Sequence, residues 1–441
     1  MDRRRKARDI LLRTLSLLTL AVVGCGTSHV SPDSSMRDAG GRDATDATDG
    51  SCCTASDSAV DGSLDSGADD GGTLTFIWEP GPTLSTFDRR VNRNVLVADN
   101  GRVVDFAGSP LGASYAVDYW TPGASAWSAD TLDQGVGFHT VSHLPDGRLL
   151  SAGSCPSSVV FNIPPRGATG GPASYGYTYA IDPETESVQI EPPMLTSRGF
   201  HRAVELLDRR VLACGGWHSD GVPATDGPTT SCERFDLPMG HWIATASMAT
   251  GRYSHTLTRL ADGKVLAAGG HDIDGHAITS AELYDPVADA WHTVGDMGAA
   301  RAWHEAQVLP SGEVLVMGGE TEEARDTGRS RSSAELFDPM TERFRPAPDM
   351  PWRAGNFASL ALPSGRVVIS GGRDRNADHN VPFVAFYDEA SGWQMGPAMS
   401  VPRSNHSMVR LLDGRLMVIE GYTEPLINDD GTSEISSEAL P

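Results

Sequence analysis

Short apolar runs separated by polar turns recur along the chain after residue 90. The segment from Arg252 to Met297 contains the runs HTLTRL, KVLAAGG and SAELYD, followed by a last run around Trp291. Short runs of this kind predict β-strands, and the Asp262-Gly263 dipeptide between the first two runs predicts a tight hairpin turn. The segment therefore predicts four antiparallel strands.

This four-strand unit repeats at intervals of about 50 residues. Two adjacent glycines end the second strand in four units, at Gly215-Gly216, Gly269-Gly270, Gly318-Gly319 and Gly371-Gly372. Degenerate forms stand at Gly108-Ser109, Gly153-Ser154 and Glu420-Gly421, which brings the number of units to seven. Four short strands repeated at this period are typical of a propeller blade. The sequence thus predicts an all-β fold, a seven-bladed β-propeller.

The third and fourth strands of each unit carry aromatic residues at fixed spacing. An aromatic-Asp pair is followed by a second aromatic residue, as in Tyr284-Asp285 with Trp291, Phe235-Asp236 with Trp242, Phe337-Asp338 with Phe344, and Tyr387-Asp388 with Trp393. Together with the glycine doublet, this pattern resembles the Kelch repeat, and the resemblance covers residues 73–441. The first two units depart most, with Ile181-Asp182 before Val188 and with Tyr119-Trp120 before Trp127.

The last unit supplies two clear strands and at most a weak third one, from Ser433 to Leu440. The missing outer strand is predicted at the other end of the domain, where Thr75 to Pro80 reads as a strand. Residues 73–84 should therefore complete the final blade and close the ring, which removes free sheet edges. The predicted blades are 89–134, 135–197, 198–250, 251–300, 301–351, 352–402, and 403–441 with 73–84.

The first 24 residues read as a signal peptide. A basic segment, Arg3 to Arg8, precedes an apolar run from Ile10 to Val23 that is too short and interrupted to span a bilayer. The run ends in Val-Val-Gly-Cys25, which resembles a bacterial lipobox. We therefore expect Cys25 to be acylated and the protein to be exported and anchored by lipid in the outer membrane. The alternative is an ordinary secretory peptide with a chance cysteine.

Residues 25–72 are predicted to be a lipidated, disordered, acidic linker. The segment after Cys25 contains ten Asp, no Glu and two Arg, and few large apolar residues. Such a composition cannot bury enough surface to fold. A tether is expected, and an acidic recognition tail is the alternative. Residues 73–441 carry a net charge of −19, which argues against nucleic acid as a partner and against membrane contact except through the lipid.

Five histidines occupy one position just before the first strand of a blade: His139, His201, His255, His304 and His406. Four of them follow an arginine by three residues, at Arg198, Arg252, Arg301 and Arg403, while Arg93 and Phe357 take the histidine position in the other two blades. The Kelch pattern commonly carries this Arg-x-x-His pair. We therefore expect a structural role toward the backbone of adjoining loops and no metal site.

The loops after the glycine doublets vary most between units, and loops on a rigid scaffold usually carry function. The candidate binding residues in them are His218, Asp220, His271, Asp272, Asp274, His276, Glu320, Arg373, Asp374, Arg375 and His379. The Asp-x-Asp-Gly segment from Asp272 resembles the start of a calcium loop, but the closing Glu is missing. Ordinary hairpin chemistry is the preferred interpretation.

Alignment of the repeats places Cys214 on the second strand and Cys232 on the third strand of one blade, so a disulfide between them is expected, as export allows. Cys52, Cys53 and Cys155 have no assigned role. Kelch propellers also form the body of galactose-oxidase-like copper enzymes and sialic acid epimerases. The copper enzymes need a tyrosine–cysteine link and a histidine from an additional domain, whereas this chain ends inside the last blade. No catalytic residues are assigned.

The sequence therefore favours a monomeric, envelope-tethered recognition module that binds a protein or a glycan through the loop face, without a cofactor. The alternative is a sugar-modifying enzyme, epimerase-like or a degenerate galactose oxidase-like protein, acting at the channel mouth. A scaffold without a small ligand is the third possibility.

Overall fold

The computed structural model describes residues 76–82, 94–106, 114–154, 174–220, 225–322, 328–423 and 433–440. Chain contacts divide the protein into two units, 1–68 and 69–441, and all described residues belong to the second. The predicted signal peptide, Cys25, the linker with Cys52 and Cys53, and Cys155 lie outside the described residues. No helix in the described part has the length and apolarity needed to cross a membrane.

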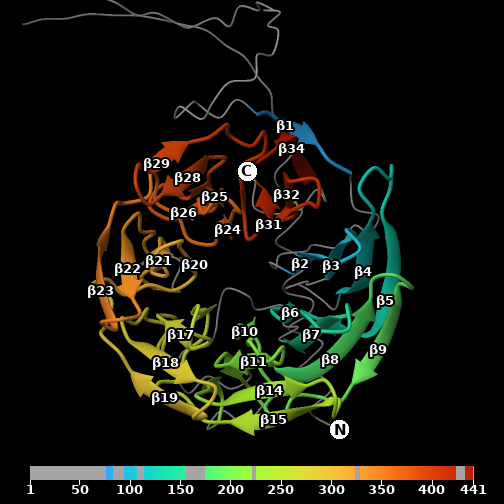
Figure 1. Cartoon of the computed structure of the whole chain (residues 1–441), viewed down its shortest axis with the longest axis vertical. Helices are drawn as coiled ribbons and strands as arrows, with labels where there is room; N and C mark the ends of the chain where they lie inside the picture. Colours follow the sequence, from blue (N-terminus) through green and yellow to red (C-terminus); the bar gives the residue numbers. More distant parts are fainter. Residues whose placement is uncertain are drawn as a thin grey trace, which may run out of the picture. The chain divides into compact units, whose positions relative to one another are not determined.

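In the described residues of the second unit there are seven four-stranded antiparallel sheets, and Figure 1 shows them arranged as blades around a central axis. From the inner to the outer strand they are β2 (Val95–Val97), β3 (Val103–Phe106), β4 (Ser114–Trp120), β5 (Ser128–Val136) in blade 1; β6 (Thr140–His143), β7 (Leu149–Ser154), β8 (Tyr175–Asp182), β9 (Ser187–Glu191) in blade 2; β10 (Arg202–Glu205), β11 (Val211–Cys214), β14 (Cys232–Asp236), β15 (His241–Thr245) in blade 3; β16 (Thr256–Arg259), β17 (Val265–Ala268), β18 (Ala281–Asp285), β19 (Ala290–Thr293) in blade 4; β20 (Glu305–Val308), β21 (Val314–Met317), β22 (Ala334–Asp338), β23 (Arg343–Ala347) in blade 5; β24 (Ala358–Ala361), β25 (Val367–Ser370), β28 (Val384–Asp388), β29 (Gly392–Met395) in blade 6; and β31 (Ser407–Arg410), β32 (Arg415–Ile419), β34 (Ser433–Ala439), β1 (Trp78–Pro80) in blade 7.

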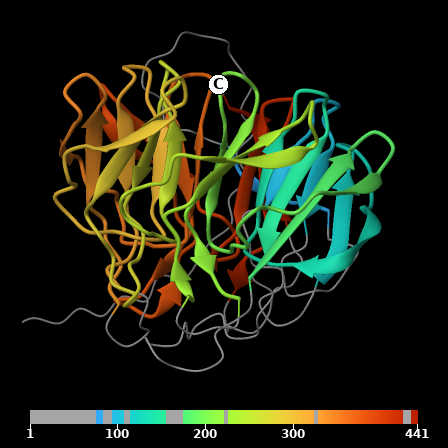
Figure 2. The same cartoon turned by 90° about the horizontal axis from the view of Figure 1, so that it is seen from below.

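Two two-stranded ribbons extend loops between second and third strands: β12 (Trp217–His218) with β13 (Gly227–Pro228) in blade 3, and β26 (Arg373–Asp374) with β27 (His379–Asn380) in blade 6. In blade 7, β30 (Arg403–Ser404), which precedes the inner strand, pairs with β33 (Tyr422–Thr423), which follows the second strand. Figure 2 shows the ring from the side, with the strands of each blade running between its two faces. The all-β, seven-bladed propeller expected from the repeat is confirmed.

The closure by an N-terminal strand is also confirmed. β1 pairs antiparallel with β34, and Trp78 lies opposite Ser436. The indole nitrogen of Trp78 donates to the carbonyl oxygen of Pro397 in blade 6 across 3.0 Å. Phe76, only 2% exposed, packs edge-on against Phe386 of the same blade. The strand that precedes the first blade therefore completes the last one.

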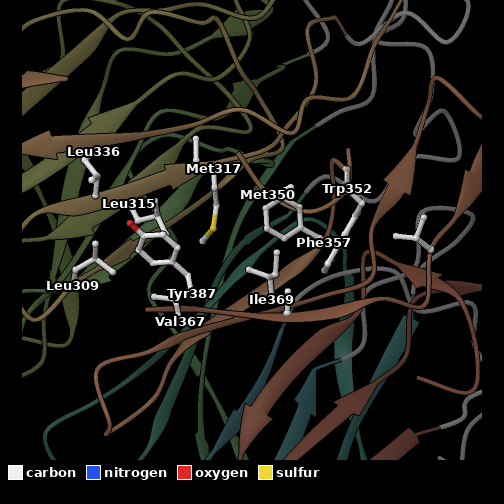
Figure 3. Close-up of a cluster of buried hydrophobic side chains, with 14 residues drawn as sticks. Leu309, Leu315, Met317, Leu336, Met350, Trp352, Phe357, Val367, Ile369 and Tyr387 are labelled. Carbon is white, nitrogen blue, oxygen red and sulfur yellow. The ribbon is translucent and has the colours of Figure 1, made fainter. Parts of the chain in front are cut away.

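The hydrophobic core lies between the blades. Figure 3 shows one such cluster, in which Leu315 and Met317 of blade 5 face Val367, Ile369 and Tyr387 of blade 6. The small, β-branched and aromatic residues of the central strands fill these layers, which is why each blade needs its neighbours. The aromatic pairs expected within blades also occur: the rings of Tyr284 and Trp291 lie 5.0 Å apart.

The glycine doublets are explained by close contact between blades. Gly215 has a φ of +64°, and a Cβ there would lie 2.6 Å from the carbonyl oxygen of Arg252 and 2.7 Å from Cε1 of His255 in the next blade. Only glycine fits such a position without strain. The second glycine, Gly216, donates its N–H to the same carbonyl of Arg252 across 2.8 Å.

Candidate binding face at the channel mouth

One face of the propeller is built from the segments that precede the inner strands and from the loops that follow the second strands; we call it the loop face. A chain of backbone hydrogen bonds runs through it around the channel, which we call the belt. Its residues stand immediately before the inner-strand histidine position in blades 2 to 7: Phe138, Phe200, Ser254, Trp303, Asn356 and Asn405.

Each belt residue after the first donates its N–H to the carbonyl of the preceding one across 2.8–3.1 Å. All six have φ between +51° and +57°, the left-handed region. Non-glycine residues in this region carry strain that the surroundings must impose. Here the inter-blade hydrogen bonds impose it, and they hold five of the six belt residues around one cavity at the channel mouth.

The belt side chains are divided into an aromatic part and a polar part. The rings of Phe138 and Phe200 stack with centroids 4.0 Å apart, and Trp303 meets Phe200 edge-on at 5.8 Å. Tyr253 and Trp217 pack behind them. Phe138 and Trp303 stay partly exposed, whereas Phe200 is 7% exposed. Phe138 and Trp303 form an aromatic surface at the mouth, and the belt continues through Asn356 and Asn405 of blades 6 and 7.

A cavity of about 40 Å³ lies among these side chains. Its lining consists of Asn94, Phe138, His139, Phe200, His201, Arg202, Ser254, Trp303 and Asn405. Pockets that enclose a drug-sized molecule are typically about 300–1,000 Å³. The cavity therefore accommodates only a small group of a ligand, while the rest of that ligand would lie on the surrounding face.

Below the face, four fully buried arginines hold the loops of their blades. Arg252 donates from Nη1 to the carbonyls of Gly269 and Ser280, both at 2.8 Å, and from Nη2 to Glu282 at 2.8 Å. Glu282 in turn accepts the N–H groups of Ala249 and Thr250. The corresponding pairs elsewhere are Arg198–Glu233, Arg301–Glu335 and Arg403–Glu434.

The backbone contacts of these arginines agree with the structural role expected for the Arg-x-x-His pair, whereas the buried glutamates were not expected. The histidines contact side chains of the preceding blade. Nε2 of His201 lies 3.0 Å from Oγ1 of Thr140, and Nε2 of His304 lies 3.0 Å from Oγ1 of Thr256. Burial lowers the pKa of His139 to about 3, so its ring is neutral at physiological pH.

The loop residues of blade 4 come together only in part. One ligand atom each from Asp272, Asp274 and His276 lies within 4.8 Å of the others, and the group holds no ion. Oδ1 of Asp272 accepts the N–H groups of Asp274 and His276, both at 2.9 Å, which is the hairpin chemistry preferred from the sequence. His271 is separate: it is fully buried against Tyr253, and burial lowers its pKa to about 3.

The loops of blades 5 and 6 do bring their predicted residues together. Glu320, fully buried, forms an ion pair with Nε of Arg375 at 2.6 Å and accepts a hydrogen bond from Asn356 of the belt at 3.1 Å. Burial raises the pKa of Glu320, and Arg375 opposes that rise. Arg373 pairs with Asp378. The ion pair between Glu320 and Arg375 thus links the belt to the turn of the β26–β27 ribbon.

The remaining predicted loop residues make local contacts. Asp374 accepts the N–H of Asn376 at 2.8 Å and lies opposite His379 in the ribbon. In blade 3, His218 contacts the carbonyl of Ser197 through Nδ1 at 2.9 Å. Asp220 accepts a hydrogen bond from Thr225 at 2.8 Å. These side chains shape the loops that surround the mouth.

A disulfide joins Cys214 and Cys232, the pair suggested by the repeat alignment. The two residues lie directly opposite each other on β11 and β14. Both are buried, at 0% and 2% exposure. Because the two sulfurs are bonded to each other, neither can form the tyrosine–cysteine link that galactose-oxidase-like copper chemistry requires.

Sequence reasoning missed the belt and Arg202. The belt positions have no common residue type, because a backbone conformation and not a side chain is repeated. Arg202 had a visible sign: it directly follows a histidine, at the position where blades 2 and 4 carry Thr140 and Thr256.

Comparisons with known proteins agree with this architecture. The Kelch motif matches residues 254–298 and 309–351. A fungal alcohol oxidase of the AA5 family, in complex with copper, has a similar structure, with a TM-score of 0.64 and 15% identity over 82% of this chain and 76% of that one. The protein YjhT is similar with a TM-score of 0.53 and 12% identity, over 71% of this chain and 99% of that one. No curated protein matches the sequence.

The chain is a Kelch-repeat β-propeller. At such low identities, the two structural neighbours support the fold alone.

Proposed function

We propose that this protein is an exported recognition module, tethered to the cell envelope through acylated Cys25, that binds a protein or a glycan with its loop face. The single observation that carries the proposal is the aromatic surface held by the belt at the channel mouth. Large, partly exposed aromatic side chains on a rigid frame are typical of recognition surfaces. The belt holds Phe138 and Trp303 in place before any ligand arrives, which lowers the entropy cost of binding.

An enzyme acting at the channel mouth is the second candidate. The similarity to a copper alcohol oxidase supports it at the level of the fold. Against it stands the small volume of the cavity, about 40 Å³, which leaves little room to enclose a substrate. The recognition proposal therefore accounts better for the geometry of the described residues.

A glycan array and a pull-down from envelope extracts test the proposed recognition. We expect one of the two to yield a ligand that binds at a single site, so that an excess of the unlabelled ligand displaces the labelled one. If neither yields a specific ligand, the proposal falls. A deep substrate-binding cleft opening at the mouth with turnover of a sugar would favour the enzyme.

The tether has its own test. We expect metabolic labelling with a fatty acid to mark the wild-type protein, and we expect Cys25→Ala to remove the label. Cys52→Ala is the matched control, because it removes another cysteine of the same predicted linker. Retained labelling in Cys25→Ala would exclude acylation at that residue.

A further inference from the structure

In blades 2 and 4, the first residue of the inner strand contacts the histidine of the next blade. Thr140 opens β6 and its hydroxyl bonds His201; Thr256 opens β16 and its hydroxyl bonds His304. A buried imidazole without a partner is costly, and a hydroxyl can either donate to it or accept from it. At two boundaries between blades, the threonine hydroxyl therefore gives a buried histidine its hydrogen-bond partner.

The boundary between blades 3 and 4 lacks this contact between a hydroxyl and a histidine. Arg202 opens β10 at the equivalent position, and its Nε donates to the backbone carbonyl of His255 across 3.0 Å. His255 is fully buried, and neither of its ring nitrogens has a hydrogen-bond partner in the described part of the chain. Replacing threonine by arginine here thus leaves a buried polar group unsatisfied, a cost that needs a compensating role.

The charge of Arg202 also lacks a partner. The four buried arginines of the Arg-x-x-His pairs each contact a glutamate, whereas Arg202 contacts no carboxylate among the described residues. Its Nη1 and Nη2 make no hydrogen bond to those residues. Burial lowers the pKa of Arg202 to about 10, so the guanidinium stays protonated at neutral pH.

The surroundings of Arg202 suit an anion. It lines the cavity at the mouth together with Ser254 and Asn405, which offer a hydroxyl and an amide donor. No Asp or Glu is among the described residues that line this cavity, although residues 73–441 carry a net charge of −19. One guanidinium with two free nitrogens matches one planar carboxylate, which it binds through two parallel hydrogen bonds.

We propose that Arg202 anchors a binding subsite for a single carboxylate group of the ligand, with the aromatic surface contacting the rest of that ligand. The inference rests on the proposed recognition through the loop face and specifies the chemistry that this face selects. A sugar acid or the terminal carboxyl of a peptide would supply the same group.

The test measures binding of small carboxylates to the full chain by calorimetry and by tryptophan fluorescence, to which Trp303 of the lining contributes. The probes are acetate, glucuronate and N-acetylalanine, each compared with an uncharged counterpart: acetamide, glucose and N-acetylalaninamide. We expect a carboxylate to bind about tenfold more tightly than its uncharged counterpart. Tighter binding of glucuronate than of N-acetylalanine would indicate a sugar acid, and the reverse order a peptide terminus.

Arg202→Thr is the decisive variant, because Thr140 and Thr256 occupy the same position in other blades and the hydroxyl would give His255 a partner. We expect it to fold and to lose the preference for carboxylates. Arg202→Gln serves if Arg202→Thr does not fold, and Arg202→Lys should retain part of the preference. Arg343→Thr, which removes an exposed arginine from β23, the outer strand of blade 5, is the control with the same change in charge.

Equal binding of the charged and uncharged probes would overturn the subsite, and so would unchanged carboxylate binding in Arg202→Thr or tighter binding of inorganic phosphate. These small probes do not depend on knowing the natural ligand. If they fail while a ligand is found by the array or the pull-down, the subsite is wrong and the recognition function stands. If the probes bind as expected while neither the array nor the pull-down yields a ligand, the subsite stands and the recognition function is wrong.

Discussion

The indole nitrogen of Trp352 donates to the carbonyl oxygen of Gly371 across 3.1 Å. In blade 5 the equivalent carbonyl, that of Gly318, accepts instead from Nη1 of the buried Arg301 at 2.8 Å. In blade 6 the arginine and glutamate positions are both alanine, Ala354 and Ala385. The buried ion pair is thus replaced as a whole, and a tryptophan takes over the hydrogen bond to the strand end.

This exchange predicts strong coupling between Arg301 and Glu335. Removing one partner leaves an uncompensated buried charge, so Arg301→Ala should lower the free energy of unfolding by about 3–5 kcal/mol. Arg301→Ala with Glu335→Ala should cost clearly less than the two single changes added together. A double-mutant cycle by urea denaturation measures the difference. Strictly additive costs would contradict the proposed exchange.

The closing strand predicts a sharp contrast between two adjacent residues. Phe76 is 2% exposed and packs against blade 6, whereas Ile77 is 60% exposed. Phe76→Ala should lower the free energy of unfolding by about 3–5 kcal/mol, because it empties a packed site. Ile77→Ala should change it by less than about 0.5 kcal/mol. Similar costs for both variants would mean that the strand does not close the ring in this register.

The disulfide between Cys214 and Cys232 closes a loop with a sequence separation of 18 residues. A loop of that size predicts a loss of about 3 kcal/mol in the free energy of unfolding when both residues are replaced by alanine. Denaturation of the oxidised wild type, the reduced wild type and the double variant measures the effect. The reduced protein should resemble the variant; equal stability of all three would remove the stabilising role.

The buried histidines predict a loss of stability in mild acid. Burial lowers the pKa of His139 and His271 to about 3 and that of His201 and His255 well below its usual range. Unfolded histidine titrates near ~6.5. The unfolded chain therefore binds more protons between about pH 6.5 and 3, so stability is complete above pH 6.5 and falls as the pH drops below it.

Unfolding in urea at pH 7.0 and 5.5 tests this dependence, because most carboxylates stay ionised in that interval. His139→Gln, which removes one buried imidazole, should reduce the dependence on pH. A free energy of unfolding that does not change between the two pH values would contradict the assignment.

Most of the fold could be predicted because the glycine doublets and the Asp-Gly turns encode local backbone geometry that repeats in every unit. The pairing of β1 with β34 followed from an absent strand at one end and an extra one at the other. The buried glutamates were harder to assign, because Glu282 and Glu335 look like ordinary strand residues until the sheet register faces them toward an arginine.

Less of the candidate site could be predicted. The loop residues drew attention through their chemistry, yet His271 and Glu320 point inward and are fully buried. The mouth itself is lined by belt residues such as Phe138 and Trp303, whose convergence depends on how the blades close around the axis. No local pattern in the sequence records that convergence.

The central claim is that the loop face binds the ligand, and substitution of the aromatic belt residues tests it most directly. Asparagine already occupies the belt in blades 6 and 7 with the same left-handed backbone, so Phe138→Asn with Trp303→Asn should preserve the fold and remove the aromatic surface. Val287→Asn, at a 96% exposed position at the opposite end of the strands, is the control. We predict that the ligand captured by the wild type and the control is lost in the double variant. Undiminished capture by the double variant would contradict the account.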